Sequence, residues 1–91
     1  MSNLNLLRKK IDLVDKQILN LLSQRMQIVL KIGELKRQKG IVPLDEIRWQ
    51  VVVDSKLLIA RSLGLDVEMV RDIYERIHKA SLRLETLLQN K

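Results

Sequence analysis

The chain has 91 residues, which is enough for one domain, and we expect residues 1–91 to form a single helical unit. Seventeen Lys and Arg against eleven Asp and Glu give a formal net charge of +6. With 46% hydrophobic and 31% charged residues, the composition is that of a globular protein rather than a disordered one. No window approaches the roughly 18 continuous apolar residues of a transmembrane helix, and no secretory signal is evident, so we expect a cytoplasmic protein.

Residue types that are rare in the chain exclude several kinds of chemistry. There are no cysteines, which excludes disulfides, thiolate zinc sites and a cysteine nucleophile. A single histidine, His78, makes a histidine-based metal site or a Ser-His-Asp triad improbable. Trp49 and Tyr74 are the only aromatic residues and leave little to stack on bases. We therefore expect no metal, no cofactor, and neither a nucleic-acid nor a membrane partner.

The first predicted helix begins near Ser2 or Asn3 and ends at about Lys39, before Gly40. Its stripe positions alternate in steps of three and four, which is a heptad pattern. One of these positions is occupied by a cation, Arg25. The stripe consists of Leu4, Leu7, Ile11, Val14, Ile18, Leu21, Arg25, Ile28, Ile32 and Leu35.

Two shorter helices follow, and no segment shows the period-2 alternation of a strand, so the sequence predicts an all-α fold. The second helix opens near Pro43 to Asp45 and ends before Gly64. Asp45 and Arg48 look like ordinary cap and first-turn residues. The third helix begins after Asp66, a good N-cap. The predicted stripes are Ile47, Val51, Leu58 and Leu63 in the second helix, and Val70, Ile73, Ile77, Ser81, Leu84 and Leu88 in the third.

The length of the first helix has a consequence for assembly. A helix of about 36 residues spans roughly 54 Å. A compact chain of this size has a radius of gyration near 12 Å, so it cannot cover such a rod. An uncovered apolar stripe of that length would be an aggregation hazard. The sequence therefore predicts an intertwined helical homodimer, in which the long helix of a second chain lies alongside.

Arg25 is the first polar residue that interrupts an apolar stripe. A guanidinium facing a core is unfavourable unless it is paired or hydrogen-bonded. It therefore belongs either to a buried ion pair, or to a side chain that reaches solvent, or to an anion pocket inside the bundle. Lys36 lies eleven residues further on, about 20° around the helix and about 16 Å along it, with Gly33 nearby. Unless Lys36 is simply exposed, the two cations could hold a small dianion between them.

Three further polar residues are candidates for the same pocket. Arg8 precedes Arg25 by about 25 Å along the helix, too far to share a small ligand within one chain. It is either a surface residue or a contribution to the partner's pocket in an antiparallel dimer. Ser81 and Glu85 lie one turn apart in the third helix and can face one cavity. The alternatives are a back-bonded core serine and a glutamate that reaches water.

Four segments, read in order, resemble the all-helical (type II) chorismate mutase family: LRKKIDLVDKQILNLLSQR, KIGELK, PLDEIR and SLRLE. The resemblance covers roughly Leu6 to Leu88 and needs no gap against the bacterial form. It implies an intertwined dimer with two equivalent active sites, each built from residues of both chains. It also implies the unimolecular rearrangement of chorismate to prephenate, which needs no nucleophile, metal or redox cofactor.

The resemblance implies a role for each catalytic residue. Arg25 of one chain and Arg8 of the other match the carboxylate-binding arginines of the family. Lys36 matches the lysine that contacts the ether oxygen and a carboxylate. Glu85 falls where many members have Gln and some have Glu, the group that hydrogen-bonds the ether oxygen from the opposite side. A glutamate can donate there only while it is protonated, and the sequence leaves its protonation state open.

The remaining matches surround the substrate. Asp45 matches the position whose backbone approaches the substrate's hydroxyl, Arg48 the arginine near the pocket mouth, and Ser81 a serine that contacts a carboxylate. Trp49 departs from the family, because many members have a Glu there that hydrogen-bonds the ring hydroxyl. An indole N–H can donate but cannot accept. The substrate therefore stays open between chorismate, isochorismate (a pyruvate lyase) and 4-amino-4-deoxychorismate (a mutase).

Two interpretations outside this enzyme class are weaker. A small basic helical nucleic-acid-binding protein is compatible with the net charge of +6, but the chain has no basic tail or recognition motif. A purely structural helical dimer, or a detached regulatory domain, would leave Arg25 in the stripe unexplained.

Overall fold

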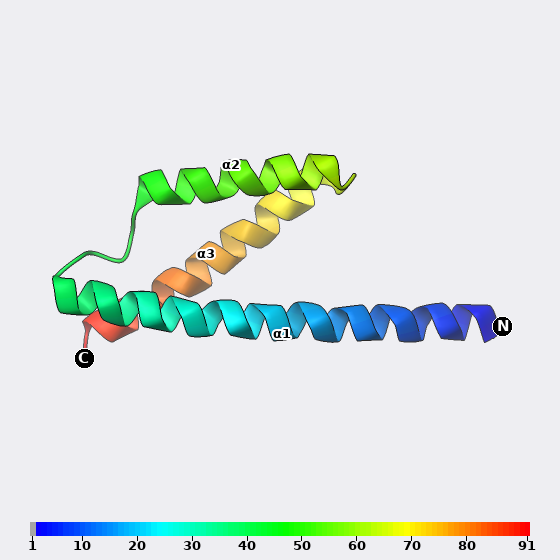
Figure 1. Ribbon diagram of the computed structural model, residues 1–91, viewed down its shortest axis with the longest axis horizontal. Coiled ribbons are helices and arrows are strands. Elements are labelled where there is room, and N and C mark those ends of the chain that lie inside the picture. Colours follow the sequence, from blue (N-terminus) through cyan, green and yellow to red (C-terminus); the bar gives the residue numbers. More distant parts are fainter. Residues whose placement is uncertain (1) are drawn as a thin grey trace.

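The computed structural model describes residues 2–91, except for the side chain of Ser2, and consists of three helices (Figure 1). Helix α1 spans Ser2–Lys39, α2 spans Glu46–Ser62 and α3 spans Val67–Gln89. The described residues include no strand. The predicted all-α fold with a long first helix is therefore confirmed.

The first two helices end at glycines, as predicted, because their final turns need a left-handed residue. Gly40 has φ 68° and Gly64 has φ 69°, values that a residue with a Cβ adopts only with strain. After Gly40, the Ile41 N–H donates to the Lys36 carbonyl at 2.8 Å, which closes a Schellman motif. The same pattern closes α2. These turns set the directions in which the chain leaves α1 and α2.

The N-termini of α2 and α3 are capped by the two predicted aspartates. Asp45 Oδ1 accepts a hydrogen bond from the Arg48 N–H at 2.9 Å. Asp66 Oδ1 accepts from the N–H groups of Glu68 and Met69. Each carboxylate satisfies amides that have no partner within the helix and lies at its positive end. The cap at Asp45 also fixes where α2 begins relative to the end of α1.

Helix α3 is the centre of the arrangement. It packs against both α1 and α2, whereas α1 and α2 do not pack against each other. In Figure 1, α3 runs diagonally from the end of α2 back to the C-terminal half of α1. A small core joins α2 to α3 through Leu57, Ala60 and Val70. The space between α1 and α2 is therefore left for a pocket with α3 along one side.

The predicted stripe of α2 is not the face that packs within this chain. Ile47 is 82% exposed, and Leu58 is also exposed. The buried residues are Val52, Leu57 and Ala60. Helix α2 carries apolar residues around most of its circumference, so spacing alone does not select the side that meets α3. The small side chain of Ala60 lets the two helices approach closely. The stripe residues found exposed are Ile47, Val51, Leu58 and Leu63.

The N-terminal half of α1 extends beyond the rest of the chain. Every side chain described between residues 3 and 21 is exposed, including Ile11 at 61%. The radius of gyration is 16.7 Å and the longest dimension is 57 Å, as expected for a rod that one chain cannot cover. Within residues 2–91, none of the helices combines the length and apolarity needed to cross a bilayer.

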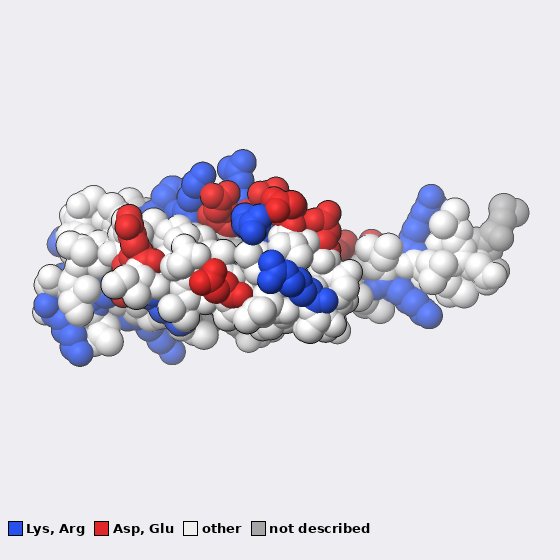
Figure 2. Space-filling view, turned by 90° about the horizontal axis from the view of Figure 1, so that it is seen from above, with Lys and Arg blue, Asp and Glu red and all other residues white. Residues whose placement is uncertain are grey.

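The charged residues are spread over the surface in both signs. In the space-filling view from the side of α2, Lys and Arg are separated by acidic and uncharged side chains (Figure 2). On this face, positive charge forms no continuous band of the kind that follows a nucleic-acid backbone.

Candidate active site

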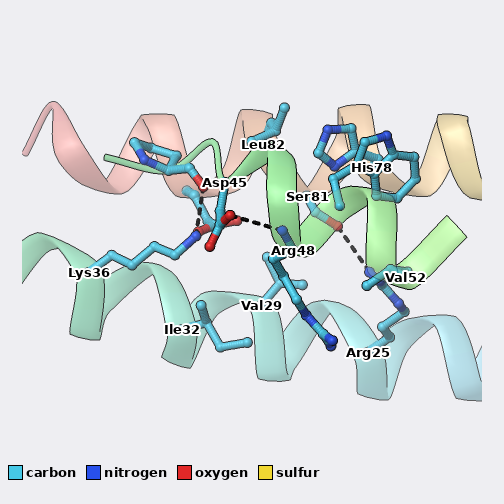
Figure 3. A pocket seen from close by; sticks show the side chains of 13 residues that line it. Arg25, Val29, Ile32, Lys36, Asp45, Arg48, Val52, His78, Ser81 and Leu82 are labelled. Carbon is cyan, nitrogen blue, oxygen red and sulfur yellow. Dashed lines mark hydrogen bonds and ion pairs between the residues drawn. The ribbon is translucent and has the colours of Figure 1, made fainter. Parts of the chain in front are cut away.

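A pocket of about 250 Å³ opens between the three helices. Seven of the eight predicted site residues line it, and the exception is Arg8, which lies on the exposed half of α1. The close view shows side chains from all three helices directed toward the space between α1 and α2 (Figure 3). The lining residues are Arg25, Val29, Ile32, Lys36, Pro43, Asp45, Arg48, Trp49, Val52, His78, Ser81, Leu82 and Glu85.

Arg25 reaches the pocket from α1 and is held by α3. Its Nη1 donates a hydrogen bond to Ser81 Oγ at 3.1 Å. The Ser81 hydroxyl in turn donates to the Ile77 carbonyl at 2.8 Å, so it is both back-bonded and part of the site. Ser81 is only 7% exposed, so the packing around it fixes the position of its hydrogen bond with Arg25. Within residues 2–91 no carboxylate pairs with Arg25, so the buried ion-pair interpretation is wrong for the single chain.

Lys36 is directed into the pocket rather than into bulk water. Its ammonium donates to the Pro43 carbonyl at 2.6 Å and lies 2.9 Å from Glu85 Oε1. Glu85 is only 7% exposed, yet Oε1 accepts no hydrogen bond of good geometry within residues 2–91. The contact with Lys36 is therefore a close ion pair whose angles are not those of a hydrogen bond. A buried acceptor with unused capacity faces the pocket beside a cation.

Gly33 allows this ion pair to form between α1 and α3. A Cβ at position 33 would lie 2.8 Å from Leu88 Cδ1 and 3.1 Å from Glu85 Cγ. Both distances are shorter than ordinary van der Waals contact, so only glycine admits α3 this close. The approach brings Glu85 within reach of Lys36, which lies one turn further along α1.

The pocket contains more cations than its own carboxylates neutralise. Three cations line it, namely Arg25, Lys36 and Arg48. Of the two carboxylates, Glu85 faces Lys36, and Asp45 caps α2. Within the described residues, neither Arg25 nor Arg48 has a carboxylate partner. Because guanidinium groups bind carboxylates in a fork geometry, the site suits a small molecule that carries two of them.

His78 is a pocket residue that the sequence analysis missed. Its imidazole stacks on Trp49, with ring centroids 3.8 Å apart and an interplanar angle of 10°. Burial lowers the pKa of His78, and the nearby Arg25 charge lowers it further, while Glu85 opposes the shift. The spacing was a usable signal, because His78 precedes Ser81 by three residues and Glu85 by seven on one helix face.

The same residues are poorly suited to a metal ion. Among residues 2–91, no group of three or more His, Asp or Glu is arranged to hold one. The polar groups instead surround apolar walls formed by Val29, Ile32, Val52 and Leu82. The pocket therefore combines apolar walls with two arginines that have no carboxylate partner within residues 2–91.

The family follows from this arrangement and from the sequence. The model of the family described as chorismate mutase type II matches residues 7–86. The chain belongs to this family. No solved structure matches the chain at a significant level.

Three relatives show how the chain compares with characterised proteins. A T-protein of Enterobacter agglomerans is 31% identical over 84 residues, which are 92% of this chain and 22% of the relative. A chorismate mutase of Methanocaldococcus jannaschii is 29% identical over 89 residues, 93% of this chain and 90% of the relative. A 4-amino-4-deoxychorismate mutase of Streptomyces pristinaespiralis is 30% identical over 82 residues, 90% and 64% respectively. The chain thus spans only 22% of the length of the T-protein.

Proposed function

We propose that the chain catalyses the rearrangement of chorismate to prephenate, with residues 1–91 acting as one catalytic unit in a homodimer. One observation carries this proposal. Two guanidinium groups that have no carboxylate partner among residues 2–91 lie in an apolar-walled pocket beside the Lys36–Glu85 pair, in a chain of this family. The similarity to a chorismate mutase of comparable length supports it.

The reaction is unimolecular, so the protein has two tasks. It must hold the enolpyruvyl arm over the ring, and it must stabilise the negative charge that grows on the ether oxygen as the C–O bond breaks. Arg25 and Arg48 are placed to bind carboxylates, and the hydrogen bond to Ser81 fixes Arg25 before the substrate arrives. Held at its carboxylates, the substrate loses the freedom to leave the reactive conformation.

Lys36 is the residue placed to stabilise the ether oxygen. An ammonium has three N–H donors. One is directed to the Pro43 carbonyl and a second faces Glu85, so one donor is left for the substrate. These two contacts orient the charge before the substrate binds, which lowers the reorganisation needed in the transition state.

Glu85 pairs with Lys36 at 2.9 Å, so it can donate to the ether oxygen only when this ion pair opens and the carboxyl group carries a proton. Glu85→Gln carries an N–H donor without needing a proton and without pairing electrostatically with Lys36, so we expect its kcat to exceed that of the wild type. A kcat for Glu85→Gln equal to or below that of the wild type in steady-state assays would contradict the proposed role of Glu85.

A second copy of the chain completes the proposed site. The exposed apolar stripe of α1 needs a cover of its own length, and another α1 supplies one. In an antiparallel arrangement, Arg8 of the partner subunit would reach the pocket, whereas Arg8 of the same chain lies about 25 Å along α1 from Arg25 and cannot. The mass in solution, measured by light scattering, tests this assembly. A monomer at assay concentrations would contradict it.

A related reaction is the second candidate. Trp49 replaces an expected acceptor with a donor, and the Streptomyces relative is a mutase of the amino-substituted compound. Purified protein should be incubated with chorismate, isochorismate and 4-amino-4-deoxychorismate in turn, and the products identified. Prephenate as the most rapidly formed product supports the first proposal. Pyruvate from isochorismate, or faster rearrangement of the amino compound, would replace it with the second.

A further inference from the structure

The single histidine and the single tryptophan of the chain lie against each other in the pocket wall. The rings are nearly parallel, at 10°, with centroids 3.8 Å apart. His78 comes from α3 and Trp49 from α2, and both are only partly buried. An imidazolium stacked on an indole gains a cation–π attraction that a neutral imidazole lacks. The stack on Trp49 therefore stabilises the protonated form of His78.

Charged groups from all three helices surround this imidazole. Arg25 approaches from α1, Glu85 lies on α3, and Arg48 lines the same pocket from α2. In the empty pocket, burial has the largest effect and lowers the pKa of His78, the charge of Glu85 raises it in part, and the charge of Arg25 lowers it further. The imidazole is therefore neutral at neutral pH when no anion is bound. A dicarboxylate bound to Arg25 would place negative charge beside the ring and offset the cost of burying the protonated imidazole.

We propose that His78 is a further substrate-binding residue, which takes up a proton from solvent when the dicarboxylate binds and contacts it as an imidazolium stacked on Trp49. This inference rests on the proposed function, because the two negative charges of the substrate drive the uptake. It adds a cation to Arg25 and Lys36 only when an anion is present. The empty pocket thereby avoids the repulsion of one more positive charge.

The inference makes binding, rather than the chemical step, depend on pH. If substrate raises the pKa of His78 by about one unit, KM falls as the pH is lowered from 8 to 5.5 and approaches a limit of about tenfold well below the pKa of the free protein. The carboxylates of the substrate stay ionised over this interval, so they add nothing to the change. The Glu85 effect proposed above acts on kcat, so the two residues are separated by measuring both constants.

The test compares the wild type with His78→Gln and Glu85→Gln. His78→Gln should bring KM at pH 5.5 close to its value at pH 8, and Glu85→Gln should keep the fall in KM. Because the chain has one histidine, its imidazole gives a single set of ring NMR resonances whose titration reports His78 directly. Adding prephenate should move that titration to higher pH. Protonation should also quench the emission of the single tryptophan in the wild type but not in His78→Gln.

The outcomes separate this inference from the proposed function. Turnover of chorismate with the same KM profile in the wild type and His78→Gln would overturn the role of His78 and leave the enzyme assignment intact. An imidazole titration that prephenate leaves unchanged, in a sample that turns over chorismate, would do the same. An imidazole that responds to prephenate in a protein without turnover would support His78 as an anion-binding residue and contradict the proposed activity.

Discussion

The two halves of α1 carry one heptad pattern but have different surroundings. Between residues 3 and 21, every described side chain is exposed. In the second half, Val29 and Gly33 are buried against the rest of the chain, and Arg25 and Lys36 face the pocket. The same spacing of apolar residues thus produces an uncovered rod and a packed helix. A heptad stripe identifies a face that needs a cover, but it does not identify which chain supplies the cover.

The proposed site uses both halves, and it uses them from different chains. The second half supplies Arg25 and Lys36 to the pocket of its own chain. In our proposal, the first half supplies Arg8 to the pocket of the partner. A substitution in one half should therefore be complemented by a chain that is substituted only in the other half, and this complementation can be measured.

The largest effect is expected from Lys36→Ala, in the second half of α1. Removing the ammonium leaves the developing charge on the ether oxygen without its nearest cation, so kcat should fall by about 10³-fold. Lys31→Ala, on the exposed surface of the same half, is the matched control and should leave kcat unchanged. A change confined to KM in steady-state assays would show that Lys36 binds substrate and transition state equally, contrary to its proposed role.

The next largest effect is expected from replacing one arginine in each half of α1. Arg8→Ala and Arg25→Ala should each lower kcat/KM by about 10²-fold, because each removes a charged hydrogen bond to a carboxylate. If the two chains are unfolded together in equal amounts and refolded, half of the dimers should be mixed, and each mixed dimer should contain one intact site. About a quarter of wild-type activity should then return. Activity no higher than the average of the two variants would contradict a shared site.

Gly33→Ala tests the packing of the second half. The added Cβ would lie 2.8 Å from Leu88 Cδ1 and 3.4 Å from the Glu85 Cα, so α3 must shift. Alanine gains about 1 kcal/mol of helix propensity, whereas overpacking costs about 1–3 kcal/mol, so we expect a net loss of about 1 kcal/mol in unfolding free energy. Urea denaturation measures it, with Gln27→Ala on the exposed side as the control. A more stable Gly33→Ala variant with full activity would show that the close approach is not needed.

The features that could be predicted from the sequence are those set by local chemistry. The helix ends follow from Gly40 and Gly64, which adopt positive φ, and from the caps Asp45 and Asp66. The common direction of Arg25 and Lys36 follows from the helical period alone. None of these features depends on how distant segments pack.

The features that were missed depend on tertiary arrangement. The packed face of α2 could not be selected, because its apolar residues surround the helix and only contact with α3 decides between Val52 and Val51. The carbonyl of Pro43 reaches Lys36 through the conformation of the connecting loop, which no residue pattern encodes. His78 was considered only for metal or triad chemistry, although its spacing from Glu85 placed it on the pocket face of α3. The intertwined dimer stays a prediction, since the exposed stripe shows only that a cover is needed.

The smallest effect is expected on the free energy of unfolding when the ligand-free protein is acidified. Its size depends on how strongly Arg25, in the second half of α1, lowers the pKa of His78 on α3. Burial and the charge of Arg25 lower the pKa of His78 below its ordinary value of 6.5, so the unfolded chain binds this proton more readily than the folded one. The contribution of neutral His78 to the free energy of unfolding is therefore fully present above pH 6.5, and it declines as the pH falls toward the pKa of His78 in the folded protein.

Urea denaturation at fixed protein concentration should therefore give a lower unfolding free energy at about pH 5.5 than at about pH 7.5, and His78→Gln should remove that part of the decline. Arg25→Leu, which deletes the cation and keeps an apolar side chain, should make the decline shallower because one of the two causes of the lowered pKa is gone. Arg8→Leu carries the same chemical change in the first half and should leave the slope unchanged. Equal slopes in Arg25→Leu and the wild type would show that the charge of Arg25 does not contribute to the lowered pKa of His78, and that burial and Glu85 set this pKa without the second half of α1.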